Sequence, residues 1–111
     1  KLCVLDLLAN NTDRKAGHCL LSRSGLIFGI DHGLCFSSEF KLRTVIWDFA
    51  NQPINEALMH GVGQVCEGSV NRVMDWLEEP EIEALISRSQ WVREHPFFPE
   101  DDGYRWPWPL I

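Results

Sequence analysis

Residues 10–36 read NNTDRKAGHCLLSRSGLIFGIDHGLCF, and this stretch decides the fold. Two short apolar runs, residues 18–22 and 26–30, flank the turn signal Arg23-Ser24-Gly25, a pattern that predicts a β-hairpin. Polar residues stand at both ends of it. Because an antiparallel hairpin returns the chain to its starting point, we expect Asp13, His18 and Asp31 to lie together at its open end.

Two carboxylates and an imidazole in one small space indicate either a divalent metal site or a general base. The alternative is structural: Asp13 would make an Asx-turn, and Asp31 would simply follow a strand. For an arbitrary hairpin the structural explanation is the better one.

The flanking segments predict helices. Residues 1–9 are apolar apart from Asp6, and their leucine spacing fits the end of a buried helix that the polar residues 10–13 stop. After Pro53 three further helices are expected: one carrying Ile54 to Val65, one capped by Ser69 and carrying Val70 to Leu77, and one running from near Pro80 to before Pro96. The fold class is therefore α+β, with the aromatics of a proline-rich tail over residues 96–111 expected to pack as an irregular strap over the helices.

Composition narrows the class of protein. The chain has 111 residues and a formal net charge of −6, enough for one small domain or a piece of a larger one. The acidic balance argues against a general nucleic-acid or anionic-membrane surface. No apolar run approaches the roughly 18 residues that cross a bilayer. The four cysteines form no metal or redox spacing, so we expect reduced core thiols in a cytoplasmic protein.

Spacing within the hairpin region carries a resemblance. His18 follows Asp13 by five residues and Asp31 follows it by eighteen, which resembles the catalytic loop and metal-binding motif of the kinase superfamily. Thr12-Asp13-Arg14 is similar to the catalytic loop of the phosphatidylinositol 3- and 4-kinases, and residues 30–36 to their Asp-x-Gly motif. With residues 43–49, these motifs most resemble an actinobacterial family of uncharacterised, phosphatidylinositol 3/4-kinase-like proteins.

The resemblance implies roles for individual residues. Asp13 would face the substrate hydroxyl, and Asp31 would be the carboxylate that holds a divalent metal on the nucleotide phosphates. Arg14 or Lys15 would offset charge on the transferred phosphoryl group. The expected cofactor is ATP with Mg²⁺ or Mn²⁺.

His18 departs from the family pattern, which has Asn at the second metal position. A neutral imidazole binds Mn²⁺ or Zn²⁺ better than Mg²⁺, which prefers oxygen. His18 is therefore either a metal ligand or a hydrogen-bonding partner of Asp13 or Asp31, and Asn10 or Asn11 is an alternative source of an amide oxygen. Arg43, in the later motif, could contact a phosphate or a carboxylate, and a plain ion pair is the expected role.

The resemblance implies the mostly helical C-terminal lobe of a kinase-like fold as one domain fragment over residues 1–111. Its parts are a catalytic loop at 10–18, a metal-binding motif at 30–36, a helical subdomain at 53–95 and the tail. A glycine-rich phosphate loop and a strand lysine are absent, and the chain starts abruptly in apolar residues.

We therefore expect an N-terminal lobe of the same protein as partner. The isolated fragment would be inactive, and an exposed start at residues 2–8 would favour a homodimer. The parent would be a kinase acting on a hydroxyl of a lipid, protein or small molecule, or a non-catalytic binding or regulatory module.

Overall fold

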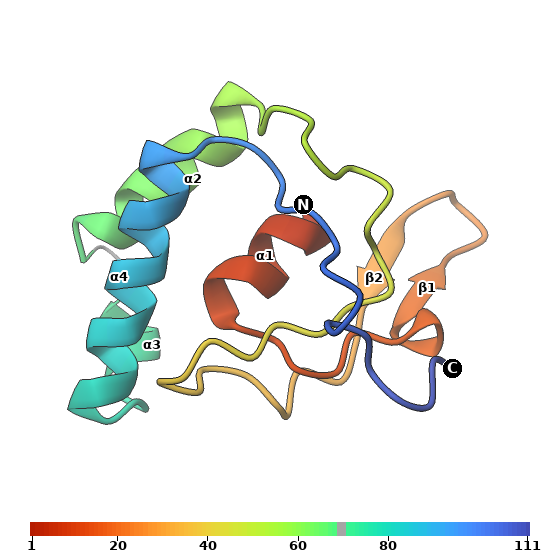
Figure 1. Cartoon of the computed structure of the whole chain (residues 1–111), viewed down its shortest axis with the longest axis horizontal. Helices are drawn as coiled ribbons and strands as arrows, with labels where there is room; N and C mark the ends of the chain where they lie inside the picture. Colours follow the sequence, from red (N-terminus) through yellow and green to blue (C-terminus); the bar gives the residue numbers. More distant parts are fainter. Residues whose placement is uncertain (69–70) are drawn as a thin grey trace.

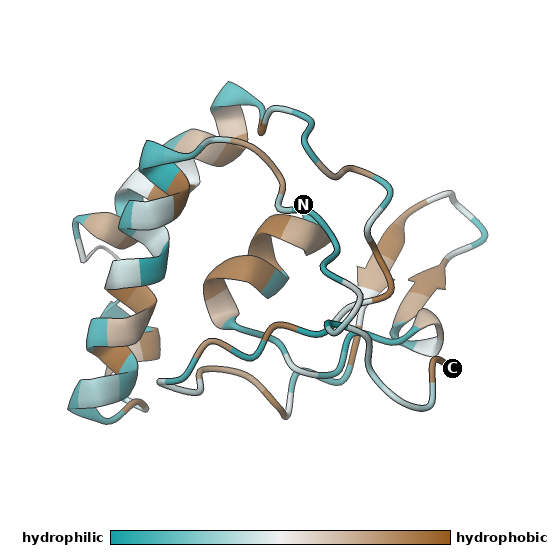
Figure 2. Ribbon diagram, viewed as in Figure 1, coloured by the Kyte–Doolittle hydropathy of each residue, from teal (hydrophilic) through white to brown (hydrophobic). Residues whose placement is uncertain are grey.

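An apolar helix stands at the centre of the fold (Figure 1). The computed structural model describes residues 1–68 and 71–111, and its first helix, α1, spans Leu2–Ala9. Figure 2 shows α1 brown along most of its surface, in keeping with its position inside the molecule. It ends at Asn10, whose left-handed backbone (φ 54°) turns the chain out of the helix.

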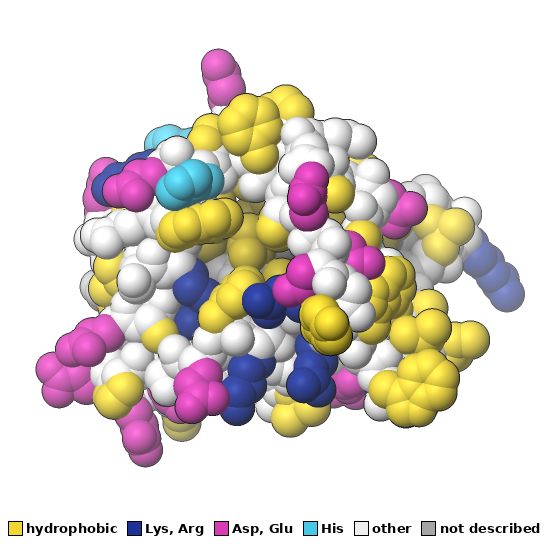
Figure 3. Space-filling view, in the orientation of Figure 1, with side chains coloured by type: hydrophobic (Ala, Val, Ile, Leu, Met, Phe, Trp, Pro, Cys, Tyr) yellow, Lys and Arg dark blue, Asp and Glu magenta, His cyan; other side chains and the backbone are white. Residues whose placement is uncertain are grey.

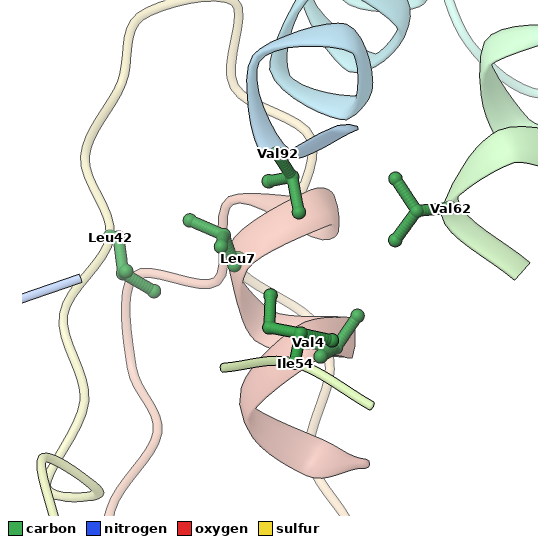
Figure 4. Packing of buried hydrophobic residues seen from close by; sticks show 6 residues of the cluster. All are labelled: Val4, Leu7, Leu42, Ile54, Val62 and Val92. Atoms are coloured by element: carbon green, nitrogen blue, oxygen red, sulfur yellow. The ribbon is translucent and has the colours of Figure 1, made fainter. Parts of the chain in front are cut away.

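Two longer helices cover one side of α1. The helices α2 (Glu56–Cys66) and α4 (Glu79–Glu94) pack against each other, and α4 also contacts α1. Six buried residues from α1, α2, α4 and two loop segments form the core (Figure 4). They are Val4, Leu7, Leu42, Ile54, Val62 and Val92. These six side chains hold the three helices and the two loop segments together, and the hairpin region is attached to this helical part.

The predicted hairpin is confirmed. A single 3-10 turn, η1 (Ala16–His18), leads into β1 (Cys19–Leu21), which pairs antiparallel with β2 (Ile27–Gly29). A backbone hydrogen bond of 3.0 Å from Ile30 N–H to the His18 carbonyl closes its base. This bond fixes the segment before Asp31 beside the segment that ends at His18.

The long helices agree with the sequence prediction, and the short one differs. The helix α4 has Pro80 in its first turn, and Glu78 and Glu81 form a capping box at its start. The helix α2 begins only at Glu56, because the Asn55 side chain caps it, so Ile54 is a core residue ahead of the helix. The helix α3 covers only Asn71–Met74. The predicted cap at Ser69, and Val70 with it, lie outside the described residues.

The tail takes a different course from the one predicted. It is irregular, but its backbone pairs with loops and with η1 instead of crossing the helices: Phe98 bonds Gln52, and Leu110 accepts from Ala16 N–H. Phe98 packs against the core. The side chains of Tyr104 and Trp108 are 88% and 85% exposed, so the expectation that the tail aromatics are packed is wrong for these two.

The apolar start of the chain is covered by the chain itself. Val4 and Leu7 of α1 are buried in the core, whereas Leu5 is 46% exposed, so the expected exposure is wrong for most of this helix. The expected homodimer stays a prediction. The four cysteines are free, as predicted, but they are only partly buried. Within residues 1–68 and 71–111, no helix has both the length and the apolar character needed to span a bilayer.

Candidate metal centre

Three side chains converge at the base of the hairpin, as the sequence predicts. Asp13, His18 and Asp31 each offer one ligand atom, and these atoms lie within 4.8 Å of one another. His18 Nε2 is 3.4 Å from Asp31 Oδ2. We call these three residues the metal centre. The backbone pairing at the hairpin base produces the convergence, since it places residues 18 and 30 side by side.

The hydrogen bond of His18 assigns its tautomer. Its Nδ1 lies 2.8 Å from the backbone carbonyl oxygen of Asp13, which can only accept, so Nδ1 carries the proton. The Lys15 N–H could donate to the same nitrogen only in the other tautomer, but at 3.4 Å it is the weaker of the two contacts. In the neutral ring Nε2 is then a bare acceptor that faces Asp31. A histidine held in this way is typical of a metal ligand, so its hydrogen-bonding role and its ligand role are compatible.

Asp31 has an unusual backbone for an aspartate. Its φ of 57° lies in the left-handed region, and its side chain is 60% exposed. Such a conformation costs on the order of 1 kcal/mol or more for a non-glycine residue, and residues of this kind cluster at functional sites. The structure therefore presents this carboxylate to solvent at a conformational cost.

Lys15 is the cation at the metal centre. Its Nζ lies 3.5 Å from Asp13 Oδ1, and both side chains are partly exposed. Lys15 is thus placed where a ligand that reaches Asp13 would also meet a positive charge.

Arg14, the other cation of the loop, points the opposite way. Its side chain is fully buried and forms a two-pronged ion pair with Asp6, with Nε–Oδ2 and Nη2–Oδ1 distances both of 2.8 Å. These hydrogen bonds raise the pKa of Arg14 above its ordinary value, so the guanidinium is always charged. The predicted role of Arg14 in offsetting phosphoryl charge does not fit this position.

Arg14 instead ties together the segments that carry the metal centre. Its Nη1 donates to the carbonyls of His18 (3.3 Å) and Ile30 (3.2 Å), and its Nη2 lies 2.8 Å from His32 Nε2. Because arginine only donates, His32 Nε2 must be the acceptor. Asn11 completes the network by donating to Asp6 Oδ1 and accepting from Asp13 N–H, each at 3.0 Å. We call Asp6, Asn11, Arg14 and His32 the cradle.

Backbone pairing explains why neighbouring residues face opposite ways. Arg14 forms a parallel bridge with Thr44, through hydrogen bonds from Arg14 N–H to the Arg43 carbonyl and from Val45 N–H to the Arg14 carbonyl. Successive side chains alternate along an extended segment, so burying Arg14 turns Asp13 and Lys15 outward. Arg43 is exposed and has no ion pair within the described parts of the chain, so its expected salt bridge is wrong.

The two asparagines considered as metal ligands have structural roles. Asn10 is fully buried, donates to the carbonyls of Ser37 and Glu39, and accepts from Lys41 N–H. Asn11 is also fully buried within the cradle. Neither amide oxygen is free for a ligand, which leaves His18 as the third donor beside the two carboxylates.

Sequence reasoning missed the role of Asp6. In the sequence, Asp6 stands out only as an interruption of an apolar helix. The available signal was its position: a lone carboxylate within the buried helix of residues 2–9 requires a buried cation, and Arg14 follows it by eight residues. His32 is a hydrogen-bond acceptor of the same network.

Comparisons with known proteins identify the family to which the chain is related. The family model described as phosphatidylinositol 3- and 4-kinase matches residues 1–60, which include the metal centre and the cradle. The chain is similar to Protein Rv2133c of Mycobacterium tuberculosis, with 38% identity over 120 residues, all of this chain and 42% of that protein. It is also 42% identical over 52 residues to phosphatidylinositol 4-kinase gamma 3 of Arabidopsis thaliana, covering 42% of this chain and 9% of that protein.

The chain therefore spans less than half the length of these two relatives. No solved structure matches it significantly. The family match covers more than half of the chain and coincides with the residues that build the site. The chain belongs to the phosphatidylinositol 3- and 4-kinase family.

Proposed function

We propose that the chain is the C-terminal-lobe part of an ATP-dependent phosphotransferase that transfers the γ-phosphate to a hydroxyl group. The acceptor is a hydroxyl of a lipid, a protein or a small molecule. The observation that carries the proposal is the convergence of Asp13, His18 and Asp31 within 4.8 Å, in a region that matches a kinase family.

The donor set fits a divalent metal. The Asp31 carboxylate and the bare imidazole nitrogen of His18 are ligands that Mn²⁺ accepts readily, whereas Mg²⁺ prefers oxygen alone. Asp31 and His18 would hold the ion. When bound, the metal would neutralise the negative charge of the nucleotide phosphates.

Asp13 and Lys15 would act on the acceptor hydroxyl, and Arg14 would support them. Asp13 would accept a hydrogen bond from the substrate hydroxyl and take its proton as the new bond forms. Lys15, 3.5 Å from Asp13, would offset the negative charge that reaches this point. Arg14 acts behind the site: it contacts no ligand and holds the carbonyls of the residues that carry or precede the metal ligands.

Other parts of a kinase are needed for turnover. No G-x-G-x-x-G sequence occurs in the 111 residues, and no lysine follows the pattern of the strand lysine that contacts the nucleotide. We propose that an N-terminal lobe of the same protein supplies these groups and is the principal partner of this chain.

The deciding experiment is an ATP-binding titration of the full-length protein with and without Mn²⁺ or Mg²⁺. We expect metal-dependent binding that Asp31→Asn weakens at least about tenfold, because the substitution removes one metal ligand. Asp75→Asn, which changes an exposed aspartate outside the metal centre, is the matched control and should leave binding unchanged. Unchanged metal-dependent binding in Asp31→Asn would refute the proposal.

A second candidate is a nucleotide-binding module without turnover. The observation that favours it is His18, which stands where the family pattern has Asn. The two candidates differ in one measurement: release or transfer of labelled γ-phosphate by the full-length protein. Metal-dependent ATP binding with no transfer to any acceptor or to water would favour the binding module.

A further inference from the structure

A pocket that is separate from the metal centre opens between α1, α4 and the start of the tail. It has a volume of about 310 Å³, and six residues line it: Leu7, Phe40, Ser87, Arg88, Trp91 and Pro99. Figure 3 shows a hollow in this face, with apolar side chains and basic groups around it. None of the lining residues belongs to the metal centre or the cradle.

The wall of this pocket is apolar with one charged exception. Leu7, Phe40, Trp91 and Pro99 supply aliphatic and aromatic surface, and Ser87 is a small exposed residue at the edge. Arg88 is the single charged lining residue, and no carboxylate lines the pocket. A volume of this size lies at the lower end of the range of about 300–1,000 Å³ that is typical of small-molecule sites.

The guanidinium of Arg88 is incompletely paired. Its Nε donates to the carbonyl of Leu8 (3.0 Å) and its Nη1 to the carbonyl of Ser37 (3.2 Å), but its Nη2 is buried without a hydrogen-bond partner. Burial lowers the pKa of Arg88 from its ordinary value. No carboxylate of the described residues forms an ion pair with it.

Capping of α1 explains only part of this arrangement. A cation beside the carbonyl of Leu8 is favourable at the C-terminus of α1. Two carbonyls satisfy two of the guanidinium nitrogens, whereas a buried positive charge with a free donor requires an anion for full compensation. The charge of Arg88 therefore favours a ligand that carries an anionic group.

We propose that this pocket binds a small amphipathic carboxylate, with its apolar chain against Leu7, Phe40 and Trp91 and its carboxylate paired with Arg88. Arg88 is the single cation of the lining and so matches a monoanion, whereas a doubly charged phosphate would call for further cations. The apolar wall requires a hydrocarbon or aromatic body of matching size. The ligand class is thus that of medium-chain fatty acids and similar carboxylates.

Isothermal titration calorimetry of the intact protein with octanoate tests the proposal. Octanol, with the same chain length and no charge, is the matched ligand control. We expect saturable binding of octanoate, and binding of octanol at least about tenfold weaker because the charge-assisted hydrogen bond is lost. Equal binding of the two compounds, or no saturable binding of octanoate, would overturn the proposal.

Variants locate the site. Arg88→Met should weaken octanoate binding at least about tenfold and leave octanol binding little changed, since only the cation is removed. Arg93→Met, which changes an exposed arginine of the same helix outside the pocket lining, should bind octanoate normally.

Arg88→Met also removes the hydrogen bonds to Leu8 and Ser37, so a second variant covers the case in which it fails to fold. Ser87→Trp keeps Arg88 and its bonds but fills the pocket from its edge, and it should abolish binding of both ligands. Octanoate binding that survives Ser87→Trp would place the ligand elsewhere and overturn the proposal. The measurement is of binding alone and does not depend on the proposed phosphotransfer.

Discussion

Two adjoining polar clusters of this molecule, the cradle and the metal centre, differ in burial and in hydrogen bonding. In the cradle, Asp6, Asn11 and Arg14 are sealed from solvent, and each polar group bonds a partner inside the chain. In the metal centre, the side chains are partly or largely exposed. Residues 13 and 14 are neighbours in sequence and belong to different clusters.

The contrast shows how one short loop supplies both structural residues and candidate functional residues. A buried charge pair is rigid but has no spare capacity, because every donor is committed. In the metal centre Asp31 is exposed and Asp13 and His18 are partly buried, so its acceptor atoms stay within reach of a ligand. Because Arg14 donates to the carbonyls of His18 and Ile30, the cradle fixes the backbone that carries the metal centre. Substitutions in the two clusters should therefore have separable consequences, and four of them test this separation.

The largest effect is expected from Arg14→Met. This change leaves the Asp6 carboxylate buried without its cation, which should lower the free energy of unfolding by about 3–5 kcal/mol, measured by urea denaturation. The control is Lys41→Met, which breaks an exposed pair with Glu39 and should cost less than about 1 kcal/mol. Similar losses in the two variants would mean that the cradle is not a tight unit.

Asp13→Asn should separate activity from stability. The amide keeps the shape of the side chain but cannot take a proton, so phosphotransfer by the full-length protein should fall by about a hundredfold or more. The free energy of unfolding should change by less than about 0.5 kcal/mol, since the pair with Lys15 is partly exposed. A large loss of stability with normal turnover would assign Asp13 to the scaffold instead.

Gly29→Ala tests how closely the chain packs beside the cradle, because it adds only a methyl group. A Cβ atom at this position would lie 2.6 Å from Leu2 Cδ2 and 3.4 Å from Arg14 Nη1. We expect a loss of about 1 kcal/mol in unfolding free energy, because Leu2 Cδ2 ends a flexible side chain that can move away, whereas Arg14 is held by its hydrogen bonds. Gly61→Ala, at a half-buried position of α2 with nothing within 4 Å of the added Cβ, is the control and should be neutral or stabilising by about 0.5–1 kcal/mol. A neutral Gly29→Ala would show that this approach is looser than the distances indicate.

His18→Asn is the mildest of the four changes and addresses metal choice. An amide oxygen in place of the imidazole nitrogen should shift the ratio of activities in Mg²⁺ and Mn²⁺ towards Mg²⁺, on the order of tenfold. Parallel titrations of both ions with the full-length protein measure this ratio. An unchanged ratio would remove His18 from the ligand set and leave it as a hydrogen-bonding residue only.

Part of the site could be predicted from the sequence because its cause is local. The turn at Arg23-Ser24-Gly25 sets the hairpin, and the hairpin brings Asp13, His18 and Asp31 together. The direction of Arg14 could not be predicted in this way. It depends on pairing with Thr44, a contact between segments far apart in sequence.

The fold shows the same division. The boundaries of α1 and α4 follow from apolar spacing and capping signals within each segment. The course of the tail does not, because its backbone is held by hydrogen bonds to Gln52, Thr44 and Ala16. Aromatic residues such as Trp108 indicate packing in general, but only tertiary structure decides which of them are left in solvent.

The exposed hairpin has a consequence for how this chain meets other chains. Both β1 and β2 are edge strands, and they carry the exposed side chains of Leu21, Ile27 and Phe28. An uncovered apolar edge is a template on which a further extended segment adds by backbone hydrogen bonding. At high concentration, self-association of the isolated chain should therefore begin here, while the proposed N-terminal lobe of the same protein would prevent it by covering the edge.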